Sequence, residues 1–164
     1  MTLSCLSNLV AQPVISNHFD VNAGLSGTDA TNVGIRYNFG QNSVGLNAGG
    51  GGAFTSGGFW SVASSISYYR HLWGHSKHTQ VLPWYIKAGV HFYYSESELT
   101  SGKFSATRNA GVRSYLGRDF NLTSRLNVST AIGPVFRFFE TWCGDQIIEP
   151  HFTFGLDISV FYRL

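Results

Sequence analysis

Apolar and polar residues alternate along most of this chain, and the alternation is clearest in its last fourteen residues. Between His151 and Leu164 every second residue is apolar, whereas the residues between them are mostly small or polar. Because successive side chains of a β-strand point to opposite faces, the pattern predicts a strand with one continuous apolar face. A tilted strand needs only about 9–11 residues to cross a bilayer, so this segment is long enough to span a membrane.

The same alternation recurs seven more times at regular spacing. The segments are residues 18–26, 32–40, 43–53, 59–72, 82–95, 103–118 and 125–140, and turn-forming residues separate them. Regularly spaced alternating segments are typical of all-β proteins, and no segment shows the helical apolar period of about 3.6 residues. We therefore expect one all-β domain, an eight-stranded antiparallel up-and-down transmembrane β-barrel.

The size of the side chains indicates which face of each strand lies inside. The apolar faces carry bulky residues, and the other faces are rich in Gly, Ser, Asn and Ala. The interior of an eight-stranded barrel is just wide enough for side chains to fill, so the small residues suit the lumen and the bulky residues suit lipid. The predicted lipid-facing aromatic residues are Trp60, Tyr68, Trp84, Phe92, Phe136, Phe138 and Phe154. The alternative is a soluble lipocalin-like carrier, with the apolar faces inside.

The composition agrees with a membrane barrel and excludes other classes. Only 12% of the residues are charged, where about 25% is usual for soluble domains. The net charge of +2 is too small to indicate a nucleic-acid partner. No motif predicts a cofactor or a metal. Cys5 and Cys143 match no metal-ligand spacing, and nothing fixes a metal geometry for His71, His75 and His78, which gather around one predicted turn.

Charged and polar residues on the inward faces predict a network that fills the lumen. They are Asp20, Arg36, Lys87, His91, Arg113, Arg137, Asp157 and Arg163. Buried charges must pair or hold water, so we expect salt bridges joining these acids to Arg36, Arg113 or Arg137. Because positive groups outnumber acids in this set, the alternative is a narrow, anion-preferring channel for ions or small solutes.

Two residues interrupt the regular pattern. Pro134 falls within a predicted strand and cannot donate to the hydrogen-bond ladder, so we expect a bulge at Gly133 and Pro134. Arg108 falls on a lipid-facing position, where an Arg at the bilayer midplane costs about 2–4 kcal/mol. We therefore place Arg108 near the outer rim of the barrel.

The first sixteen residues precede the predicted barrel domain, residues 17–164. Residues 1–12 are mildly apolar, with the small residue Ala11 near their end. We interpret residues 1–16 as the remnant of a secretory signal peptide. A short disordered lead is the alternative.

Over residues 17–164 the chain resembles the small outer-membrane β-barrels of Gram-negative bacteria, the OmpA/OmpX-like or porin-family kind. The strand–turn–strand units GIRYNFGQNSVGLNAG and YLGRDFNLTSRLNVSTAIG carry the resemblance, together with the ending GLDISVFYRL. That ending resembles the C-terminal signal read by the barrel-assembly machinery. Its matching residues are Gly155, Ile158, Val160, Tyr162 and Leu164, and Leu164 stands where the family often has Phe.

The resemblance implies location and partners. It implies a bacterial outer membrane, with outer-membrane lipid, lipopolysaccharide, the barrel-assembly machinery and an unidentified envelope protein as partners. Both chain ends would lie in the periplasm, and residues 26–31, 53–58, 96–102 and 141–150 would form outer loops. The acids assigned to these loops and their rims, which would share divalent cations with lipopolysaccharide phosphates, are Asp29, Glu96, Glu98, Glu140, Asp145 and Glu149. The charged residues assigned to the periplasmic side are Arg70, Lys77, Arg118, Arg125, Arg163 and Asp119.

Some barrels of this size are lipid-A acylases or deacylases, and the deacylases place a His and a Ser two residues apart on one strand face. At this spacing His91 is followed by Tyr93 and His151 by Thr153, so neither is followed by Ser, and Thr is a poor substitute for Ser. We therefore expect no enzymatic activity, and a structural, adhesive or envelope-complex role.

Overall fold

The computed structural model describes residues 17–53, 59–98, 104–142, 146–148 and 150–164. In these residues it forms nine β-strands, which are β1 (His18–Ser26), β2 (Ala30–Phe39), β3 (Asn42–Ala53), β4 (Phe59–Trp73), β5 (Trp84–Glu98), β6 (Phe104–Asn121), β7 (Leu126–Trp142), β8 (Gln146–Ile148) and β9 (His151–Arg163). A helix long and apolar enough to cross a membrane does not occur in the described residues.

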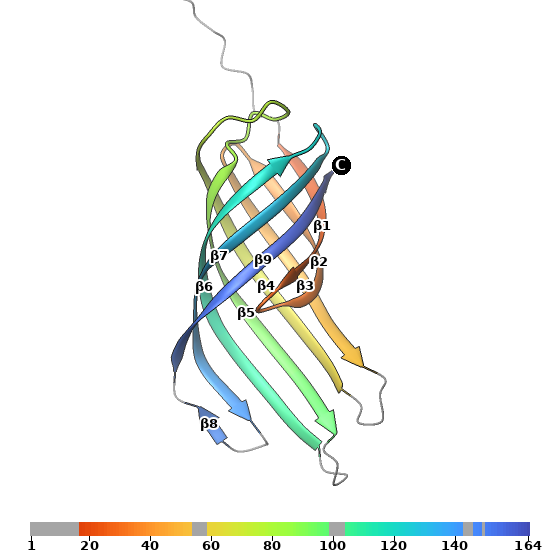
Figure 1. Ribbon diagram of the computed structural model, residues 1–164, viewed down its shortest axis with the longest axis vertical. Coiled ribbons are helices and arrows are strands. Elements are labelled where there is room, and N and C mark those ends of the chain that lie inside the picture. The colour runs from red at the N-terminus through yellow and green to blue at the C-terminus, as the bar shows by residue number, and fades with distance from the viewer. Residues whose placement is uncertain (1–16, 54–58, 99–103, 143–145, 149) are drawn as a thin grey trace, which may run out of the picture.

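Eight of the nine strands close into a barrel in which all neighbours are antiparallel. The order around the wall is β1-β2-β3-β4-β5-β6-β7-β9, and β9 pairs back with β1 (Figure 1). In the described residues, β8 pairs only with β7. The "turn end" of the barrel holds the β2–β3, β4–β5 and β6–β7 connections, and the opposite end is the "loop end". The predicted eight-stranded antiparallel barrel is confirmed.

Strand β4 shows how the residues divide between the two surfaces of the wall. From Ser61 to His71, odd-numbered residues are buried and even-numbered residues are exposed. Around the wall the outward residues are mostly apolar, and many are large; Ile66, Ile132 and Leu156 are each more than half exposed, at 53%, 58% and 53%. The buried residues are mostly polar. An apolar exterior around a polar interior suits hydrocarbon, so this is a transmembrane barrel, and the soluble-carrier alternative is wrong.

The seven aromatic residues expected to face lipid all lie on the outer surface. Five are exposed, and Trp84 and Phe136 are half-buried against neighbouring rings. Trp84 stacks on Trp73 with ring centroids 6.2 Å apart. Phe136 lies 4.7 Å from the ring of Phe152. Arg108 also points outward, near the loop end, with its guanidinium 5.4 Å from the Tyr94 ring centroid.

The bulge expected at Gly133 and Pro134 is wrong. Pro134 interrupts the β6–β7 ladder without changing its register, because Arg113↔Val135 and Leu116↔Ile132 follow the same alignment on its two sides. The register changes further along, between Ala110 and Gly111 of β6. The extra residue there is Phe138, so that Phe138 and Phe139 are both exposed. The hydrogen bond that Pro134 cannot donate therefore leaves the register of β6 and β7 unchanged. The bulge lies nearer the loop end.

Replacing Ile158 with Arg tests the assignment of the outer surface. Ile158 lies midway along β9 and is 43% exposed. An Arg at the hydrocarbon midplane costs about 2–4 kcal/mol and near the interface about 0–1 kcal/mol. We expect Ile158→Arg to lower the free energy of unfolding in phospholipid vesicles by the larger amount. Tyr162→Arg, near the turn end of the same strand, is the control and should cost the smaller amount. Equal costs at both depths would contradict the assignment.

Candidate functional site

A cluster of charged residues fills the lumen at the turn end. Arg36, on β2, donates to Asp20 on β1 at 2.9 Å and lies 3.6 Å from Asp119 on β6. Asn38 also donates to Asp20, at 2.8 Å. The Arg36 guanidinium stacks on the ring of Phe161, 3.8 Å from its centroid. The cavity between these side chains measures only about 10 Å³, so side chains occupy this part of the lumen.

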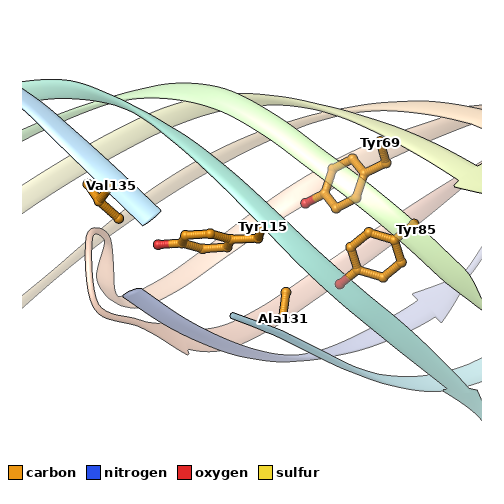
Figure 2. Close-up of a cluster of buried hydrophobic side chains, with 5 residues drawn as sticks. All are labelled: Tyr69, Tyr85, Tyr115, Ala131 and Val135. Atoms are coloured by element: carbon orange, nitrogen blue, oxygen red, sulfur yellow. The ribbon is translucent and has the colours of Figure 1, made fainter. Parts of the chain in front are cut away.

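The middle of the lumen combines an ion pair with aromatic rings. Lys87 on β5 is paired with Asp157 on β9, which also accepts a hydrogen bond from Ser159 at 3.1 Å. Around this pair lies a buried cluster of apolar side chains, shown in Figure 2, formed by Tyr69, Tyr85, Tyr115, Ala131 and Val135. The Tyr85 and Ser129 hydroxyls are hydrogen-bonded at 2.5 Å. The rings and the ion pair together close the centre of the barrel.

A second charged cluster lies toward the loop end and contains Asp29, Arg113 and three hydroxyls. The Arg113 guanidinium donates to Asp29 at 2.7 Å, to Ser65 at 2.6 Å and to Ser67 at 3.0 Å. It also donates to Thr28. Ser65 donates to Asp29 at 2.8 Å. Every one of these side chains is buried.

The expectation that Asp29 belongs to a solvated outer loop is wrong, because Asp29 is only 1% exposed. The β1–β2 connection is a short turn at residues 27–29 that bends into the lumen, and Ala30 takes a left-handed backbone conformation with φ 53°. A Cβ atom at Gly49 would lie 2.2 Å from the Asp29 carbonyl oxygen, so only glycine permits this close approach. Arg113 explains the inward position, since a buried charge needs a counter-charge.

The expected excess of positive charge in the lumen is also wrong. Four buried aspartates (Asp20, Asp29, Asp119 and Asp157) face three buried cations (Arg36, Lys87 and Arg113). The half-buried Arg137 and Arg163 complete the set, and Arg137 pairs with Glu140 at 2.9 Å. Asp119 lies at the turn end, the end that the prediction assigns to the periplasm, but it faces the lumen because β6 continues past it to Asn121. Asp119 is therefore in phase with Arg113 and Tyr115, which also point inward from β6. The alternation in the sequence could have predicted that Asp119 faces the lumen.

The remaining residues that the sequence singled out lie outside these clusters or at their edges. His91 is buried in the lumen, and Arg163 lies 3.9 Å from Asp20 at the turn end. His151 lies 3.4 Å from Glu140, which faces the lumen side rather than an outer loop. His71 is buried, with Nδ1 2.7 Å from the Leu82 carbonyl, whereas His75 and His78 are exposed. The described residues contain no group of three or more potential metal-binding side chains.

Removing Arg113 tests the buried cluster. Breaking a buried ion pair costs about 3–5 kcal/mol, because it leaves an uncompensated charge. We expect Arg113→Met to lower the free energy of unfolding in vesicles by this amount. The double variant Asp29→Asn, Arg113→Met should cost less than the sum of the two single variants. Arg108→Met, the same change on the outer face of the same strand, is the control and should cost about 1 kcal/mol or less. Additive costs for Asp29 and Arg113 would show that they are not coupled.

Comparisons with known proteins support the fold. No protein-family model matches the sequence, and no curated protein matches it significantly. Among solved structures, the chain is similar to the crystal structure of Neisserial surface protein A, with a TM-score of 0.51 and 11% sequence identity. The alignment covers 90% of this chain and 96% of that chain. The likeness shows a shared barrel fold with a bacterial surface protein, while membership of the OmpA/OmpX-like group stays an expectation.

Proposed function

We propose that this protein is an integral barrel of a bacterial outer membrane, with a closed lumen and a structural or interactive role in the envelope. The observation that carries the proposal is an apolar exterior surrounding a lumen filled by paired charges. A lumen filled in this way provides rigidity rather than passage. The similarity to a Neisserial surface protein supports the location.

Lipid, lipopolysaccharide and the barrel-assembly machinery are the partners that this location entails. The proposed assembly signal lies on β9, the strand that completes the barrel by pairing with both β1 and β7. Its outward residues Ile158, Val160 and Tyr162 face lipid. Asp29 and Glu140 face inward, so they no longer belong to the outer acids that we propose to share divalent cations with lipopolysaccharide. Among the described side chains Glu96 remains, where it accepts a hydrogen bond from Trp60 at 2.9 Å, and Glu98, Asp145 and Glu149 lie outside the described side chains.

Conductance measurements test the closed lumen against the narrow-channel alternative. The protein, folded and inserted in a planar lipid bilayer, should give no resolvable current steps, because its charges are paired and the turn-end cavity is too small to conduct. Heat-modifiable gel mobility of the same preparation shows that the barrel is folded. Stable steps from folded protein would support the channel and contradict the closed lumen.

One arrangement would support catalysis, and lipid-A analysis tests it. His151 lies 3.4 Å from Glu140, and Thr153 follows on the same half-buried face. An acid, a histidine and a hydroxyl are the elements of a hydrolase site, but the Glu140 carboxylate also pairs with Arg137 at 2.9 Å. We expect the lipid-A mass spectrum of cells overproducing the protein to equal that of cells producing His151→Ala. A loss of acyl chains only with the unaltered protein would establish an enzyme.

A further inference from the structure

The barrel wall is incomplete at the loop end, between β3 and β9. The β-ladders of the β1–β2 hairpin end at Ser26↔Asp157 and Thr31↔Gly50, and one further hydrogen bond runs from the Gly27 N–H to the Leu156 carbonyl at 2.9 Å. Beyond these positions, residues 51–53 pair only with β4 and residues 151–155 pair only with β7, as far as the described residues show. Figure 1 shows the β1–β2 turn ending well short of the loop ends of β3 and β9. We call this gap the breach.

The breach lies at the level of the lipid headgroups. β1 has 9 residues, which at about 3.3 Å each and a tilt of about 40° rise by about 23 Å. The apolar band of such barrels is about 25 Å tall, so the β1–β2 turn reaches only its outer boundary. Peptide groups along the edges of the breach need hydrogen-bonding partners that hydrocarbon cannot supply. Polar headgroups and water can supply them.

The outer rim of the breach is strongly apolar. Phe152 and Phe154 of β9 are 75% and 80% exposed, more than any other large hydrophobic residue on the described surface. Both belong to the part of β9 with which no described strand pairs on the β1 side. The rim therefore offers apolar surface next to unpaired backbone, an arrangement that suits an amphiphile rather than a purely polar or purely apolar molecule.

Above the inward β1–β2 turn lies a polar cavity of about 260 Å³, which we call the vestibule. The β1–β2 turn forms its floor, and its walls include Tyr93, Thr107, Asn109, Arg137 and Glu140. Arg137 and Glu140 pair at 2.9 Å, so they supply hydrogen bonds with little net charge. The buried Nε of Arg137 has no hydrogen-bond partner among the described residues. The cavity is large enough to hold several water molecules. Hydroxyls, an amide and a neutralised ion pair suit an uncharged, hydroxyl-rich group.

We propose that the breach admits the sugar headgroup of an outer-leaflet glycolipid into the vestibule, while Phe152 and Phe154 flank the headgroup at the membrane surface and the acyl chains stay in the hydrocarbon below. The inference rests on the proposed function, because it needs the loop end to face a glycolipid leaflet. The inward β1–β2 turn makes this site, since it lowers the wall on one side and closes the vestibule below. The headgroup replaces water at the strand edges and at Arg137.

Titration with matched detergents tests the proposal. Isotope-labelled protein in phosphatidylcholine nanodiscs is titrated with dodecyl maltoside, and the amide signals of Gly27 and Asn109 are followed by NMR. We expect saturable shifts with dodecyl maltoside and none with dodecyldimethylamine oxide, which has the same chain without hydroxyls. Thr107→Trp, which fills the vestibule, should weaken the apparent affinity by about tenfold or more, equivalent to about 1.4 kcal/mol. Thr130→Trp, on the outer face of β7, is the matched control and should leave it unchanged.

Each other outcome contradicts the proposal in a distinct way. Equal shifts with both detergents would mean that the chain, not the headgroup, is bound. Equal affinity for free maltose would place the source of the ligand in water rather than in the membrane. Unchanged binding by Thr107→Trp, or no binding by folded protein, would exclude the vestibule. Failure of the chain to insert and to show heat-modifiable mobility would instead overturn the proposed function, and this inference with it.

Discussion

The buried guanidinium of Arg113 is the constraint on which the loop-end half of the barrel depends. Its side chain is fully buried in the lumen, where a charge without a partner is very costly. Asp29 supplies the counter-charge, and it reaches Arg113 only because the β1–β2 turn bends inward. That bend closes the lumen, shortens the hairpin relative to β3 and β9, and forms the floor of the vestibule. The Asp29–Arg113 ion pair therefore accounts both for the filled lumen and for the gap in the wall at the loop end.

Size matching between tyrosines and glycines sets the packing of the centre. A Cβ atom at Gly117 would lie 2.3 Å from the ring of Tyr85, so this ring fits only against a bare backbone. Tyr69 and Tyr85 contact each other edge to face at 5.4 Å. The abundance of glycine on inward faces therefore reflects the room that a few large rings and long charged side chains need within an eight-stranded wall.

The two halves of the lumen differ in free volume. At the turn end, Arg36, Asp20 and Asp119 leave almost no free volume, and the Lys87–Asp157 pair closes the centre. Above the Asp29–Arg113 cluster the lumen widens into the vestibule, and the proposed headgroup enters it through the breach. The filled turn-end and central parts of the lumen are thus separate from the vestibule, so binding in the vestibule need not open the lumen.

The sequence by itself determined the all-β class, the eight barrel strands and the lipid-facing surface, because a period of two residues records in the chain which face each residue takes. It also placed Asp20, Arg36, Arg113 and Asp157 on inward faces. It could not assign partners, because pairing depends on register and on the ends of strands, which alternation marks poorly. Only the tertiary structure brought Asp29 into the lumen, where the buried Arg113 requires it, and only the unequal lengths of neighbouring strands created the breach.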